Sequence, residues 1–169
     1  MSFEHEAEHE HLYANTVIPG LLQTREYALA IHQAREVRSP NDVIEQMVDA
    51  RIQRQGILRR EPPLHLWAVL DEAVIRRTVG NSAVMAQQLE HLYQMTQSPT
   101  VEIQILPFSA GAHAAGAGQF VILGRYDERN RVAVRDSKAP GGPTLAFPAA
   151  AFAAFVDEVR GASADGRLV

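Results

Sequence analysis

The sequence contains no cysteine, and Lys138 is its only lysine among 169 residues. Without cysteine the chain can form no disulfide, no thiolate nucleophile and no thiolate metal site. The other basic side chains are arginines spread along the chain, and the formal net charge is −4. Because binding to nucleic acid needs a clustered positive field, direct contact with DNA or RNA is not expected.

Long hydrophobic runs are also missing. No apolar stretch approaches the roughly 18 residues that a membrane span requires. The first residues, MSFEHEAEHEHLY, are acidic and rich in histidine, unlike a signal peptide. Hydrophobic residues make up 46% of the chain and charged residues 21%, which is typical of a globular domain. We therefore expect a cytoplasmic protein that does not contact a membrane.

Sequence motifs of the common catalytic classes are absent as well. The chain has no G-x-S-x-G, P-loop, G-x-G-x-x-G or H-E-x-x-H pattern, and no cofactor is expected. His5, His9 and His11 alternate with glutamates, and His5 and His9 would share one face of a helix. This segment has no third ligand at a fixed distance, so no metal site is predicted.

The order of the predicted elements indicates an α+β fold. The glutamates and alanines of residues 1–16 favour a lead-in helix. Hydrophobic periodicity and turn residues predict the remaining elements. Helices are expected near 21–34, 41–59, 71–77, 82–95 and 149–160, and strands near 64–70, 101–106, 120–126, 131–135 and 144–147. Most strands follow one another late in the chain, which predicts several helices packed on a largely antiparallel sheet of four or five strands.

Five segments occur in the order and with the spacing of one known family. They are VIPGLLQTREYA (17–28), VDARIQRQGIL (48–58), HLWAVLDEAVIRRTVG (65–80), MAQQLEHL (85–92) and VEIQILPFSAGAHAA (101–115). These segments resemble the domain of unknown function that lies C-terminal to Xre-type helix-turn-helix domains in actinobacterial regulators of the WhiJ kind. The resemblance implies a regulator-effector-like domain over residues 17–126, without a helix-turn-helix of its own.

The end of the chain carries a second resemblance. RVAVRDSKAPGGPTLAFPAAAFAAFVDEVRGA (131–162) is similar to the C-terminal half of a small actinobacterial family often encoded beside such regulators. We expect residues 127–162 to form a strand, loop and helix that complete the same domain, followed by a disordered tail at 163–169. On that last helix Phe152 and Phe155 could close the core or pair with a second chain, which leaves a homodimer open.

Polar side chains are predicted to gather where the strand at 64–70 ends. Asp71 and Glu72 follow this strand, and Arg76 lies one helical turn after Glu72. Carboxylates in such a place suit ligand binding or acid–base chemistry, and the alternative is a structural ion pair between Glu72 and Arg76. His113 lies in a Gly/Ala-rich loop and is either a ligand contact or pH-sensitive group, or simply an exposed side chain.

Two further candidates precede that strand. Gln23 and Thr24 follow a Pro-Gly turn, where they could cap the next helix or line a cleft. Arg51 lies on the polar face of the predicted helix at 41–59, either in solvent or reaching a buried carboxylate such as Glu72. The predicted ligand-binding residues are therefore Gln23, Arg51, Glu72, Arg76 and His113.

Two functions follow from these observations. The resemblance implies a regulatory module that binds a small molecule or a related regulator protein and does not bind DNA itself. The alternative is a natural-product biosynthetic enzyme, because one fold can carry different functions that depend on the residues of its site. Such an enzyme would be a cofactor-independent cyclase or isomerase that uses carboxylate acid–base chemistry, with Asp71, Glu72 and His113 as its candidate catalytic residues.

Overall fold

A four-stranded sheet forms the centre of the computed structural model, which describes residues 7–113, 120–124, 131–134 and 145–148. Its strands are β1 (His9–Ala14), β2 (His65–Asp71), β3 (Val101–Leu106) and β4 (Phe120–Gly124), in the spatial order β3–β2–β1–β4. β1, β2 and β3 are parallel, and β4 runs antiparallel to β1. β5 (Arg131–Val134) and β6 (Leu145–Pro148) form a separate antiparallel pair.

The prediction of a largely antiparallel sheet is wrong, because β1, β2 and β3 run in one direction. The error begins at residues 1–16, where a helix was predicted and His9–Ala14 is instead a strand. Helix propensities differ by less than about 1 kcal/mol per residue, so strand pairing on both edges of β1 outweighs them. With β1 in place, helices separate the first three strands, and such crossovers produce parallel pairing.

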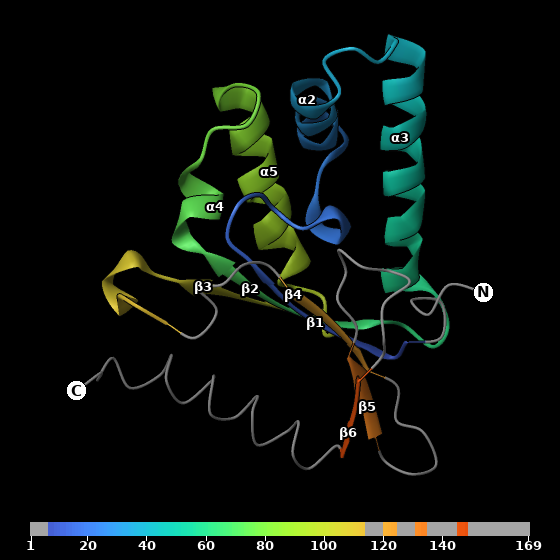
Figure 1. Ribbon diagram of the computed structural model, residues 1–169, viewed down its shortest axis with the longest axis vertical. Coiled ribbons are helices and arrows are strands. Elements are labelled where there is room, and N and C mark those ends of the chain that lie inside the picture. Colours follow the sequence, from blue (N-terminus) through green and yellow to red (C-terminus); the bar gives the residue numbers. More distant parts are fainter. Residues whose placement is uncertain (1–6, 114–119, 125–130, 135–144, 149–169) are drawn as a thin grey trace.

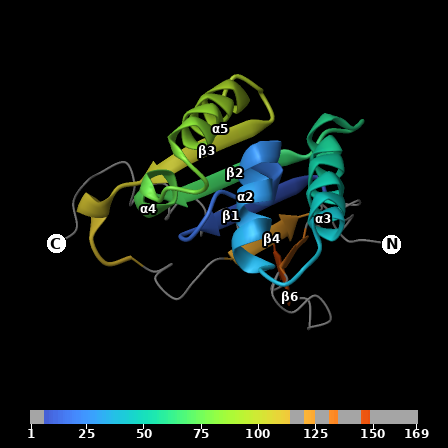
Figure 2. The ribbon, with the colours of Figure 1, turned by 90° about the horizontal axis from the view of Figure 1, so that it is seen from above.

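Helical segments connect the parallel strands. Between β1 and β2 lie the 3-10 turn η1 (Gly20–Leu22), α2 (Arg25–Arg35), α3 (Asn41–Arg54) and the 3-10 turn η2 (Gln55–Arg59). Between β2 and β3 lie α4 (Glu72–Arg76) and α5 (Ser82–Met95), and η3 (Phe108–Ala110) follows β3. Figure 1 shows α2, α3 and α5 on one face of the sheet, and Figure 2 shows them spread across it from above. The connections from β1 to β2 and from β2 to β3 move in the same direction across the sheet. Because crossovers of parallel strands are right-handed, their helices lie on the same face.

Most other element predictions agree with the structure. α5 and β3 occupy the predicted residues 82–95 and 101–106. The Thr24 hydroxyl caps α2 by accepting a hydrogen bond from the Tyr27 amide at 3.2 Å. The predicted helix at 41–59 is α3 continued by η2. The predicted last helix and the predicted disordered tail lie outside the described residues.

Side chains alternate between the two faces of the sheet. Leu12 and Ala14 of β1 are buried in the core beneath the helices, where β2 adds Leu66 and Leu70. α2 contributes Tyr27, whose hydroxyl accepts a hydrogen bond from the Ile18 amide at 3.2 Å. The apolar core therefore lies between the sheet and its helical layer.

The opposite face of the sheet is rich in histidine and aromatic side chains. His9 stacks on His65 with ring centroids 5.2 Å apart, and His11 meets the edge of Trp67 at 5.3 Å. Burial lowers the pKa of His9, and the neighbouring His65 adds to this effect. His5 lies outside the described residues. Within the described ranges no group of three or more His, Cys, Asp or Glu side chains could hold a metal ion.

In the part of the chain that the structure describes, no helix combines the length and the apolar character that crossing a membrane requires.

Gln88 of α5 fixes the segment that joins η1 to α2. Its side chain is fully buried. The amide oxygen accepts a hydrogen bond from the Thr24 amide, and the amide nitrogen donates to the Leu22 carbonyl, both at 2.7 Å. The side chain thus provides hydrogen-bond partners for two backbone groups that no helix or strand pairs. Buried backbone groups need such partners.

Replacing Gln88 with alanine should destabilise the fold by about 3 kcal/mol, because two buried backbone groups lose their partners. Urea unfolding monitored by circular dichroism measures this loss. The matched control is Gln87→Ala, an exposed neighbour on the same helix, which should change stability by less than about 0.5 kcal/mol. Equal midpoints for the two variants would show that Gln88 is not an anchor.

Candidate functional site

The predicted site residues fall into two groups at different places in the fold. Gln23 and Arg51 lie together beside η1, where the Arg51 Nη1 donates a hydrogen bond to the Gln23 Oε1 at 2.9 Å. Arg51 therefore binds an amide and not the carboxylate of Glu72. The other predicted residues lie where strands β2 and β3 end, and these are Asp71, Glu72, Arg76 and His113.

Gln23 belongs to a network of amides that holds the segment around η1. It is buried, and its Nε2 donates to the Ile18 carbonyl at 2.6 Å. Gln55 Nε2 donates to the carbonyls of Gly20 and Gln23 at 2.9 and 2.7 Å. Gln23 does not cap α2, since Thr24 fills that position. These contacts give Gln23 and Arg51 a positioning role at the base of the helical layer.

Asp71 and His113 come together with Tyr13, a residue that sequence reasoning missed. The Tyr13 hydroxyl donates to Asp71 Oδ2 at 3.2 Å, and His113 Nε2 lies 3.4 Å from that hydroxyl and 3.9 Å from the same Asp71 oxygen. Asp71 Oδ1 also caps α4 by accepting from the Ala73 amide at 2.8 Å. Tyr13 escaped notice because its segment was predicted to be a helix. The carboxyl ends of parallel strands commonly position ligands.

The electrostatics of this group keep Tyr13 protonated. Burial, followed by the neighbouring Asp71, raises the pKa of Tyr13 to about 12. At neutral pH the tyrosine is therefore a hydrogen-bond donor to Asp71, and Asp71 Oδ2 also lies near the imidazole of His113. This arrangement can relay or hold a proton.

Glu72 is occupied by two partners. The Arg76 Nε donates to Glu72 Oε1 at 2.5 Å, and the Phe108 amide donates to Glu72 Oε2 at 2.8 Å. The Phe108 bond, then the Arg76 bond, lowers the pKa of Glu72. The structural ion pair that was the alternative interpretation is the geometry observed, and Glu72 also ties η3 to α4.

The Tyr13–Asp71 contact makes a testable prediction. In Asp71→Asn the pKa of Tyr13 should fall from about 12 but stay above its ordinary value of 10.0, because burial is the larger cause and persists. Tyrosine Cζ resonances followed through a pH titration report this pKa, with the signal of exposed Tyr93 as internal reference. An unchanged Tyr13 titration in the variant would refute the contact.

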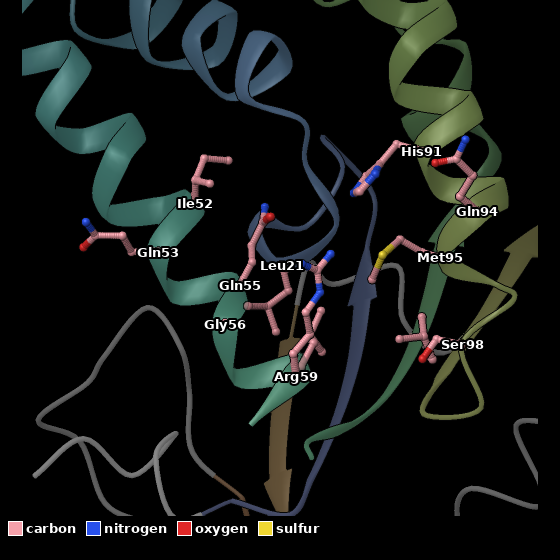
Figure 3. Close-up of a pocket in the computed structure, with 12 residues that line it drawn as sticks. Leu21, Ile52, Gln53, Gln55, Gly56, Arg59, His91, Gln94, Met95 and Ser98 are labelled. Carbon is pink, nitrogen blue, oxygen red and sulfur yellow. The ribbon is translucent and has the colours of Figure 1, made fainter. Parts of the chain in front are cut away.

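A cleft of about 610 Å³ opens between η2 and the C-terminal half of α5, shown in Figure 3. Its volume lies within the range of about 300–1,000 Å³ that is usual for small-molecule sites. The walls come from η1, η2 and α5, and their side chains include Leu21, Gln55, Arg59, His91 and Met95. Gln23 and Arg51 do not line the cleft, but Gln55 both lines it and anchors η1.

Arg59 and His91 are the ionisable side chains of this cleft. In Figure 3 the Arg59 side chain rises into the cleft from η2, and the His91 ring enters from α5. Burial lowers the pKa of His91, and the charge of Arg59 lowers it further, so the imidazole is neutral at pH 7. The buried His91 Nε2 has no hydrogen-bond partner among the described residues. Sequence reasoning passed over both residues, although His91 and Met95 lie one turn apart on α5.

The described residues form a mixed α/β domain with a cleft between its helices. The chain belongs to the family described as Domain of unknown function (DUF5753), whose model matches residues 1–165. That match runs through residues 17–126 and through the 127–162 segment that carries the second resemblance. No curated protein and no solved structure matches the chain.

Proposed function

We propose that this chain is a regulatory module that binds a small molecule in the cleft between η2 and α5 and does not bind DNA itself. The observation that carries the proposal is a cleft of about 610 Å³ lined by His91, whose Nε2 is one of several buried polar atoms without a hydrogen-bond partner among the described residues. Buried polar atoms are normally hydrogen-bonded, so a ligand that pairs with His91 Nε2 would gain affinity.

The regulatory part of the proposal rests on where the resemblance falls. Four of the five segments that resemble the effector domains of actinobacterial Xre and WhiJ-type regulators meet at the cleft. Segment 17–28 supplies Leu21, segment 48–58 supplies Gln55 and Gly56, segment 85–92 supplies His91, and segment 101–115 supplies Val101. A ligand seated there would stabilise the arrangement of η1, η2 and α5, and a change of population of this kind can alter contact with a related regulator protein.

A fragment library screened by thermal shift and by amide chemical shifts tests the proposal. We expect fragments that raise the melting temperature to perturb the amides of Leu21, Gln55 and His91. Gly56 allows a matched pair of variants, because a Cβ added there would meet no atom within 4 Å. Gly56→Trp should fill the cleft and abolish fragment binding, whereas Gly56→Ala should retain it.

Both glycine variants should unfold at nearly the temperature of the unmodified protein, which separates blocking of the cleft from misfolding. Binding that survives Gly56→Trp would place the ligand elsewhere. A library without any fragment that perturbs the cleft amides would reject the proposal.

An enzyme remains the second candidate, favoured by the contact of Tyr13, Asp71 and His113 at the carboxyl ends of the strands. Its chemistry would need these side chains and not the cleft. In the native host, Asp71→Asn and His113→Ala should then change the metabolite profile measured by mass spectrometry, and Gly56→Trp should not. Unchanged profiles in the first two variants would reject this candidate.

A further inference from the structure

We infer that the ligand of the cleft is a small carboxylate with an apolar body, held by Arg59 and His91. This inference rests on the proposed function and names the chemical class of the ligand. It starts from the charges that line the cleft: among the twelve lining residues, all within the described part of the chain, one is an arginine, one is a histidine and none is acidic.

Arg59 has a positive charge that the described residues do not neutralise. Arg25, Arg76 and His113 lie in ion pairs with carboxylates, whereas none of these pairs includes Arg59. Its guanidinium is charged at every physiological pH and presents a fork of donors that suits a carboxylate. An anion placed in the cleft would therefore gain a charge-assisted pair without displacing an existing one.

His91 adds to this preference from the opposite wall. Burial is the larger cause of the lowered pKa of His91, and the positive charge of Arg59 lowers this pKa further. An anion between them would reverse that effect and allow the imidazole to donate a hydrogen bond from Nε2. Both cleft walls thus favour negative charge at the same place.

The rest of the lining suits an uncharged, largely apolar body. Leu21 forms part of the wall from η1, Ile52 and Leu58 lie on the α3–η2 side, and Met95 comes from α5. Gln55 and Gln94 add neutral amides. One guanidinium and one imidazole match a single carboxylate, whereas a doubly charged phosphate would usually require more cationic groups. A carboxylate on an aromatic or aliphatic frame therefore fits the lining better than a phosphate ester does.

Four matched probes test the inference: 2-naphthoate, its neutral analogue 2-naphthamide, the cationic 2-naphthylmethylamine and the phosphate ester 2-naphthyl phosphate. Calorimetry at pH 7 gives the affinities, and amide shifts of Leu21 and His91 locate the binding. We expect 2-naphthoate to bind about tenfold more tightly than the amide, as one charge-assisted hydrogen bond would provide. 2-Naphthyl phosphate should bind no better than 2-naphthoate.

Variants assign the preference to the two side chains. Arg59→Gln should remove the advantage of 2-naphthoate over 2-naphthamide, and His91→Gln should reduce it. Arg38→Gln, at an exposed position outside the cleft lining, is the matched control and should leave the ratio unchanged. Unfolding curves of each variant confirm that the fold is intact.

The outcomes separate this inference from the proposed function. If the amide or the amine binds in the cleft as tightly as 2-naphthoate, the cleft is a ligand site and the inference of a carboxylate is wrong. A phosphate that binds best overturns the carboxylate in the same way. If 2-naphthoate does not bind while neutral library fragments do, only the inference fails, whereas a cleft that binds no fragment removes both.

Discussion

Strand β1 has backbone partners on both edges, β2 on one side and β4 on the other, and this pairing organises the rest of the fold. Its residues alternate between the helix-covered core, which takes Leu12 and Ala14, and the opposite face, which takes His11 and Tyr13. Because β1 and β2 run parallel, the long connection between them crosses over the sheet, and it places α2 and α3 on the face that α5 also covers.

The helical layer depends on side-chain amides as well as on apolar packing. The segment around η1 has few regular backbone bonds. Its own Gln23, together with Gln55 of η2 and Gln88 of α5, supplies side-chain partners for it. Gln88 attaches the segment to α5, and Gln55 attaches it to η2. The same contacts set the two sides of the cleft, because η1 lies between them. Arg51 supports this arrangement through Gln23 without reaching the cleft.

The domain thus contains two separate sets of polar side chains, one at the carboxyl ends of the strands and one in the cleft between η2 and α5, and the two sets differ in chemistry. At the carboxyl ends of the strands Tyr13, Asp71 and His113 already contact one another. In the cleft, Arg59 has no ion pair and the His91 Nε2 has no hydrogen-bond partner within the described part of the chain. His113 Nδ1 is likewise buried without a hydrogen-bond partner among the described residues, so this property does not separate the two groups. The cleft carries the proposed function because it adds a volume of about 610 Å³ beside Arg59 and His91.

The sequence by itself determined the elements with strong local signals. The alternation of β3 and the helical period of α5 depend on neighbours in the chain, and both elements were predicted correctly. The cap of α2 was one of two alternatives for Gln23 and Thr24, and Thr24 fills it. Tertiary structure decided the state of β1, because its partners β2 and β4 are distant in sequence and outweigh a weak helix propensity. The parallel sheet and the contact of Tyr13 with Asp71 followed from that pairing. Arg59 and His91 line one cleft only because tertiary packing brings η2 and α5 together, which no local pattern predicts.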